Sequence, residues 1–234
     1  MPGSGGRRPC LGVRQLGAPT APSARRRAWL STLSLLLLCA CLSRAATAHE
    51  LKAAPAPRDL GISPAPRLPV IKRAPDFTLR DTADRPVHLS ALRGRAVLLS
   101  FIYTQCSVAC PLVTQRMVRL HDRLVRAGLR RTAVFLTVSV DPERDSARVL
   151  ERYAAHFGGP RAGWKFLRDE PDRVRRVLEV YDEWTRPQPD GGIDHPARIY
   201  LIDPRGDIRE IYSLSFFDER QAFVDIRALA REFP

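Results

Sequence analysis

Two long apolar runs separated by an amphipathic segment most strongly constrain the fold of this 234-residue chain. Residues 97–103 and 132–140 are continuously apolar rather than alternating, which is typical of strands buried on both faces. Between them, residues 112–126 carry apolar side chains at helical spacing, and Gly128 follows as a stop. A strand, a helix and a second strand in this order predict a β-α-β unit and therefore parallel strand pairing.

The rest of the pattern extends this unit into one α/β domain. The remaining expected elements are a hairpin of 76–79 and 87–89, helices 146–157, 171–181 and 218–233, a strand 164–167, and a hairpin of 197–202 and 208–212. The last two strands are joined by too short a turn to be parallel, so the sheet is expected to be mixed. This order resembles the thioredoxin-like fold: a central mixed sheet flanked by helices, here with an N-terminal β-hairpin extension.

Residues 1–48 have the layout of an export signal rather than of folded structure. Three arginines at 25–27 precede the uncharged, Leu-rich segment 28–42, and Ala46-Thr-Ala48 gives a small-residue cleavage pattern. An uncleaved membrane anchor is one alternative, and a lipoprotein signal acylated at Cys41 is another. In each version the globular part leaves the cytoplasm.

Residues 49–73 are rich in Pro and Ala and predict an extended linker, so the globular domain is expected over residues 74–234. The formal charge of +13 falls to +6 without residues 1–48, which hold seven arginines and no acidic residue. Basic and acidic residues alternate in the remainder, and no stripe of basic and aromatic residues occurs. Nucleic-acid binding is therefore not expected.

Cys106 and Cys110 are the only cysteines after residue 48, and they lie where the first apolar run gives way to the helix. Positions i and i+4 share a helical face, so both a disulfide and one shared soft metal ion are compatible with this spacing. A helix N-terminus lowers the pKa of a thiol, so at least one thiolate is expected near neutral pH.

Thiolates favour Cu(I) and zinc. Two sulfurs alone leave copper under-coordinated, so a third ligand is expected. His195 ends an irregular stretch from about residue 182 and directly precedes a predicted strand, which makes it the candidate; an ordinary surface histidine remains the alternative. His121 and His156 are expected on solvated helix faces, and His88 is expected to point outward from the first hairpin.

Three segments, in this order, resemble the Sco/SenC family: Tyr103-Thr-Gln-Cys106-x3-Cys110-Pro111, Val138-Ser-Val-Asp-Pro-Glu-Arg-Asp145, and Asp194-His195 before Tyr200-Leu-Ile-Asp203. The resemblance covers about residues 74–234 and implies a thioredoxin-fold copper chaperone for cytochrome c oxidase. It implies copper, as Cu(I), Cu(II) or both, on Cys106, Cys110 and His195. The family's frequent Cys-Pro-Asp-x-Cys form is absent, because Ser107-Val-Ala109 separates the cysteines.

The resemblance further implies delivery of copper to the copper A site of oxidase subunit II, at the periplasmic side of the inner membrane. Other copper chaperones and thioredoxin-like reductants are further candidate partners. Asp141 or Asp145 either interacts with the metal site or a partner, or serves as a strand end and helix cap.

Two enzymatic readings stay open. A thiol–disulfide reductase would use Cys106 and Cys110 as its redox pair and needs no histidine. A peroxiredoxin-like peroxidase is suggested by Ala74-Pro-Asp-Phe-Thr-Leu79, although the residues before Cys106 fit such enzymes only in Thr104.

Overall fold

The computed structural model describes residues 61–234, and the predicted signal segment and the first part of the predicted linker, residues 49–60, lie outside them. Leu60–Pro234 forms one compact unit by its internal contacts. Within the described residues, no helix is both long and apolar enough to cross a membrane.

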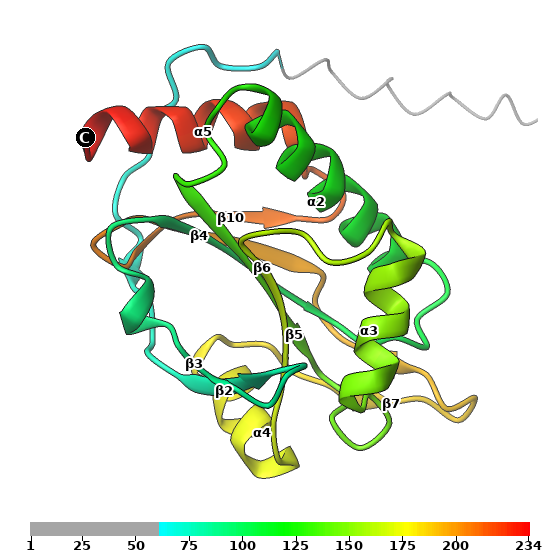
Figure 1. Cartoon of the computed structure of the whole chain (residues 1–234). Helices are drawn as coiled ribbons and strands as arrows, with labels where there is room; N and C mark the ends of the chain where they lie inside the picture. Colours follow the sequence, from blue (N-terminus) through cyan, green and yellow to red (C-terminus); the bar gives the residue numbers. More distant parts are fainter. Residues whose placement is uncertain (1–60) are drawn as a thin grey trace, which may run out of the picture. The chain divides into compact units, whose positions relative to one another are not determined.

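An eight-stranded mixed sheet forms the centre of this unit (Figure 1), in the spatial order β1-β10-β9-β4-β5-β6-β2-β3. The strands are β1 (Lys72–Arg73), β2 (Thr78–Asp81), β3 (Pro86–His88), β4 (Ala96–Ile102), β5 (Ala133–Ser139), β6 (Trp164–Arg168), β9 (Arg198–Ile202) and β10 (Asp207–Ser213). Strands β4, β5 and β6 are parallel, whereas β9 is antiparallel to both β4 and β10. The predicted β-α-β unit and the mixed sheet are confirmed.

Four α-helices cover the sheet: α2 (Ala109–Arg126), α3 (Ala147–His156), α4 (Pro171–Val180) and α5 (Glu219–Glu232). One core cluster packs α2 and α5 on one face of the sheet, and a second packs α4 and the β2–β3 hairpin on the other. All seven residues of β4 are buried, because helices cover both faces of this strand. A short 3₁₀ helix, Ser90–Leu92, precedes β4.

Local sequence sets the helix ends. Gly128 has a φ of +72°, and the N–H of Leu129 bonds the carbonyl of Leu124 at 2.8 Å, which closes α2. The Ser146 hydroxyl accepts a hydrogen bond from the N–H of Val149 and so begins α3.

Three features differ from the expectation. The N-terminal hairpin is not an appendage, because β2 pairs with β6 and continues the main sheet. Composition assigned Leu68 and β1 to the linker, but Leu68 is buried and β1 pairs with β10, so packing begins before residue 74. The stretch after residue 182 also contains a small hairpin of β7 (Arg186–Pro187) and β8 (Ile193–Asp194).

Candidate metal and thiol site

The two cysteines follow the carboxyl end of β4, which lies near the middle of the sheet between β9 and β5. The chain turns after Tyr103, whose carbonyl accepts the N–H of Cys106 at 3.3 Å, and α2 begins at Ala109. Cys106 is half-buried, Cys110 is only 1% exposed, and both are free thiols. The N–H of Cys110 points at the Cys106 sulfur, 3.3 Å away. The site therefore has one accessible sulfur and one enclosed sulfur.

The hydrogen bond between the two thiols, more than the helix start, makes their pKa values differ. A hydrogen bond from Cys110 lowers the pKa of Cys106 to about 5, and the N–H groups of Cys110, Val108 and Ala109 add to this effect against the opposing effect of burial. The pKa of Cys110 is raised, first because of the same bond to Cys106 and then because of burial. Near neutral pH the pair is thus a Cys106 thiolate beside a Cys110 thiol.

His195 meets the cysteines from the segment between β8 and β9. Its Nε2 lies 3.7 Å from the Cys110 sulfur. Burial lowers the pKa of His195, so the imidazole is neutral at pH 7 and has a free lone pair for a metal. A thiolate and an imidazole that share one ion, at bond lengths of about 2.3 and 2.0 Å, are roughly 3.6–3.8 Å apart. The observed separation fits such a pair.

Cys106 and His195, the remaining pair of the three candidate ligands, do not contact each other directly. Among residues 61–234, no three His, Cys, Asp or Glu side chains already surround one metal position. Cys110 contacts both Cys106 and His195, so a bound ion would have to draw the Cys106 sulfur and the His195 ring toward a common centre. The donor set itself, two sulfurs and one imidazole, suits Cu(I).

Tyr103 contacts both His195 and the segment that carries it. Its ring meets the His195 ring edge-on, with centroids 5.8 Å apart. Its hydroxyl oxygen accepts the N–H of Ile193 at 3.2 Å and so ties the histidine segment to the end of β4. The sequence placed Tyr103 at the end of an apolar strand and at the start of the cysteine segment that resembles the family, but it did not indicate the contact with His195.

Arg144 joins three segments around the site. Its guanidinium donates to the Gly191 carbonyl at 2.6 Å, to Gln105 Oε1 at 3.3 Å and to the Asp141 carboxylate. The histidine segment, the cysteine turn and the loop after β5 are thus held by one side chain. Charge alternation in the sequence gave no indication of this role.

Asp145 is fully buried beneath the cysteine turn. It accepts hydrogen bonds from the Thr104 N–H at 3.2 Å, the Thr104 hydroxyl at 2.5 Å and the Ser139 hydroxyl at 2.6 Å. Asp145 was expected either to contact the metal site or a partner, or to serve as a strand end and helix cap. It does neither, because Ser146 caps α3 and Asp145 holds the residues just before Cys106. Its pKa is raised, mainly by burial.

Glu183 lies at the start of the histidine segment and is 3% exposed. It accepts a hydrogen bond from the Tyr200 hydroxyl at 2.6 Å, and Arg198 Nη1 lies 3.6 Å away. Burial raises its pKa to about 7, although both neighbours oppose this effect. Glu183 thus titrates near neutrality.

The other histidines within residues 61–234 do not join the site. His88 and His156 are exposed, as expected. The expectation for His121 is wrong: it is 7% exposed, its Nε2 lies 3.1 Å from the Ala162 carbonyl, and its ring packs on Phe135. An imidazole fits this apolar face because the carbonyl satisfies one ring nitrogen.

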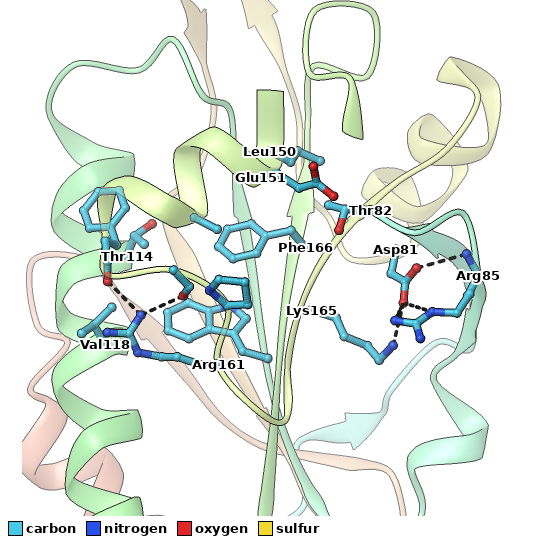
Figure 2. A pocket seen from close by; sticks show the side chains of 15 residues that line it. Asp81, Thr82, Arg85, Thr114, Val118, Leu150, Glu151, Arg161, Lys165 and Phe166 are labelled. Carbon is cyan, nitrogen blue, oxygen red and sulfur yellow. Dashed lines mark hydrogen bonds and ion pairs between the residues drawn. The ribbon is translucent and has the colours of Figure 1, made fainter. Parts of the chain in front are cut away.

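A separate cavity of about 200 Å³ lies between α2, α3 and β6 (Figure 2). Trp164 and Phe166, stacked at 5.7 Å, line one side, and Lys165 on the other side pairs with Asp81 at 2.7 Å. The cavity is lined by neither Cys nor His. It is therefore distinct from the thiol site.

The family model described as SCO1/SenC matches residues 69–231 of this chain, which is more than half of it. The chain belongs to the SCO1/SenC family. A putative copper-binding protein of Stutzerimonas stutzeri is 27% identical over 146 residues, covering 61% of this chain and 70% of that protein.

Two solved structures show the shared fold. A SCO1/SenC family lipoprotein from Bacillus anthracis has a TM-score of 0.64 at 23% identity, covering 70% of this chain and 98% of that one. BsSco, described with a disulfide switch and as a member of the Sco family of cytochrome c oxidase assembly proteins, has a TM-score of 0.62 at 23% identity with the same coverage. The predicted thioredoxin-like α/β fold is confirmed.

Proposed function

We propose that this protein is a copper-binding metallochaperone that delivers copper to the copper A site of cytochrome c oxidase subunit II. The observation that carries the proposal is the 3.7 Å approach of His195 Nε2 to the Cys110 sulfur, across 85 residues of sequence. Membership of the SCO1/SenC family, a copper-binding relative and a family name tied to oxidase assembly support it.

The protein's own groups suit metal hand-over. The Cys106 thiolate is accessible, so an acceptor's ligand can approach the ion from that side while Cys110 and His195 still hold it. Because Cys110 keeps its proton in the free protein, copper binding releases that proton. Oxidation of the two sulfurs to a disulfide would remove both sulfur ligands and prevent binding.

Anaerobic Cu(I) titration of the reduced fragment 49–234 tests the proposal, with His195→Ala as the variant and the exposed His88→Ala as the matched control. We expect one Cu(I) per protein, an affinity on the order of 100-fold weaker in His195→Ala, and no change in His88→Ala. Equal affinity in all three proteins would remove His195 from the site.

A second function, thiol–disulfide reduction of oxidase cysteines, is favoured by the unequal acidities of the two thiols. The Cys106 thiolate would attack a substrate disulfide, forming a mixed disulfide and releasing one substrate thiolate. Cys110, on losing its proton, would then attack the Cys106 sulfur, releasing the second substrate thiolate and leaving the protein disulfide. Cys110→Ser should trap the mixed disulfide, whereas His195→Ala should leave this activity intact.

We further propose that the domain acts outside the cytoplasm, on the periplasmic side of the inner membrane. The predicted export segment and the lipoprotein description of the Bacillus anthracis relative support this location. Intact mass of the mature protein distinguishes cleavage after Ala48, acylation at Cys41 and a retained anchor.

Sustained peroxide turnover by the metal-free protein would support a peroxiredoxin-like peroxidase in place of the chaperone.

A further inference from the structure

An exposed apolar surface adjoins the thiol site along α2. Val108, the residue before the helix, is 74% exposed, and Leu112, one turn later on the same row, is 37% exposed. Large exposed apolar side chains that lie together mark interaction sites more often than scattered ones do. Val108 is two residues from the Cys106 thiolate, so this surface begins at the accessible sulfur.

A second segment with an exposed apolar side chain is fixed against the same helix. Arg116, the next residue in the row, donates to the carbonyls of Leu214 and Phe217 at 2.7 Å each, which fixes the loop between β10 and α5 against α2. Phe216 lies within that loop and is 77% exposed. The N–H of Leu214 also bonds the Ala197 carbonyl at 2.9 Å, so the loop adjoins the histidine segment as well.

These contacts define an apolar rim of Val108, Leu112 and Phe216. From Val108 to Arg116 the row spans about 12 Å, at 1.5 Å per residue. Arg116 is engaged by two carbonyls, and Arg119, further along α2, pairs with Glu219 at 2.9 Å. A partner that covers the rim therefore buries apolar surface and leaves neither arginine without its partner. Such a surface has the apolar, uncharged composition that is typical of an interface core.

We propose that the apolar rim is the docking surface for the copper-accepting protein, whose own soft ligands emerge from a neutral, apolar face. The inference rests on the proposed function, because transfer by ligand exchange requires the acceptor to touch Cys106 and hence to cover Val108. Ser107-Val-Ala109 carries no charge between the cysteines, so an acceptor that relies on charge pairing has no partner there.

The test follows Cu(I) transfer from the loaded 49–234 fragment to the copper-free soluble domain of oxidase subunit II from the same organism. Val108→Ser and Phe216→Ser should each retain Cu(I) affinity within about twofold, yet slow second-order transfer by about five- and tenfold. Val125→Ser is the matched control, because Val125 is 44% exposed on the last turn of the same helix. Its transfer rate should equal that of the wild type.

Salt provides an independent readout. Apolar docking predicts less than about a twofold change in transfer rate between 0.05 and 0.5 M salt, whereas charge-steered docking slows steeply. Wild-type transfer rates in both rim variants, or a steep salt dependence, would overturn the inference and leave the chaperone proposal standing. A dimer of this chain that Phe216→Ser dissociates would assign the rim to a second copy instead. If the wild type bound Cu(I) but gave none to the acceptor, both proposals would fall.

Discussion

The two halves of the thiol site are built differently. Cys106 and Cys110 lie where the fully buried strand β4 gives way to α2. A buried carboxylate, Asp145, holds the turn between this strand and the helix through Thr104. His195 arrives on an irregular segment that is tied down by side chains, chiefly Tyr103 and Arg144. The cysteine half is part of the core, whereas the histidine half is attached to it.

Because of this difference, we expect substitutions in the cysteine half to change the free energy of unfolding and substitutions in the histidine half to change the ligand geometry. A change under the cysteine turn leaves buried donors without acceptors, so it should cost folding free energy. A change in the ties of the histidine segment exposes little core, so it should mainly alter how well His195 meets the metal. Four measurements test this division.

Asp145→Ala should have the largest effect. It leaves the Thr104 N–H and the hydroxyls of Thr104 and Ser139 without their acceptor, so we expect the free energy of unfolding to fall by about 3 kcal/mol. Urea denaturation measures it, with the exposed Asp172→Ala as the control, for which the expected change is below about 0.5 kcal/mol. Equal stability of the two variants would show that the cysteine half is not part of the cooperative core.

Glu183 should make stability depend on pH. Its pKa is raised from 4.5 to about 7 in the folded state, so the folded protein holds a proton that the unfolded chain releases. Its stabilising contribution is full below pH 4.5 and is lost as pH rises through 7, by roughly 3 kcal/mol. Glu183→Gln should flatten this part of the stability profile, and Glu179→Gln on exposed α4 should not. A profile unchanged by Glu183→Gln would contradict the raised pKa.

Arg144→Ala should weaken Cu(I) affinity by about tenfold, or ~1.4 kcal/mol, because Gly191 loses its tie to the cysteine turn. The pKa of Cys106, followed by thiolate absorbance, should stay near 5, since the N–H groups of α2 and Cys110 set it. Arg175→Ala, on the exposed part of α4, serves as the control. A loss of stability larger than the loss of affinity would place Arg144 in the core half.

Tyr103→Phe should have the smallest effect. It keeps the ring against His195 but removes the acceptor of the Ile193 N–H, so Cu(I) affinity should fall about threefold. Spectra of the Cu(II)-loaded protein should show a wider range of histidine geometries. Tyr153→Phe, which breaks only a contact with Thr114, should leave both readouts unchanged. A similar change in both variants would argue against a specific tie.

Periodicity predicted the elements well where one physical requirement dominated. Continuous apolar runs identified β4 and β5, and Gly128 and Ser146 marked helix ends, because each signal acts within a few residues. His121 was misplaced because helical spacing alone does not show that Trp164 and Phe135 cover that face. The β7–β8 hairpin was missed because two-residue strands have no measurable period.

The sequence by itself determined the class of the domain, the position of Cys106 and Cys110 at a helix start, and the need for a third ligand. These follow from local periodicity and from the chemistry of thiols. Only the tertiary structure decided that His195, and none of the other described histidines, reaches Cys110, and that Tyr103, Arg144 and Asp145 hold the parts in place. These contacts join residues up to 90 positions apart, and no local pattern specifies which distant segments the sheet brings together.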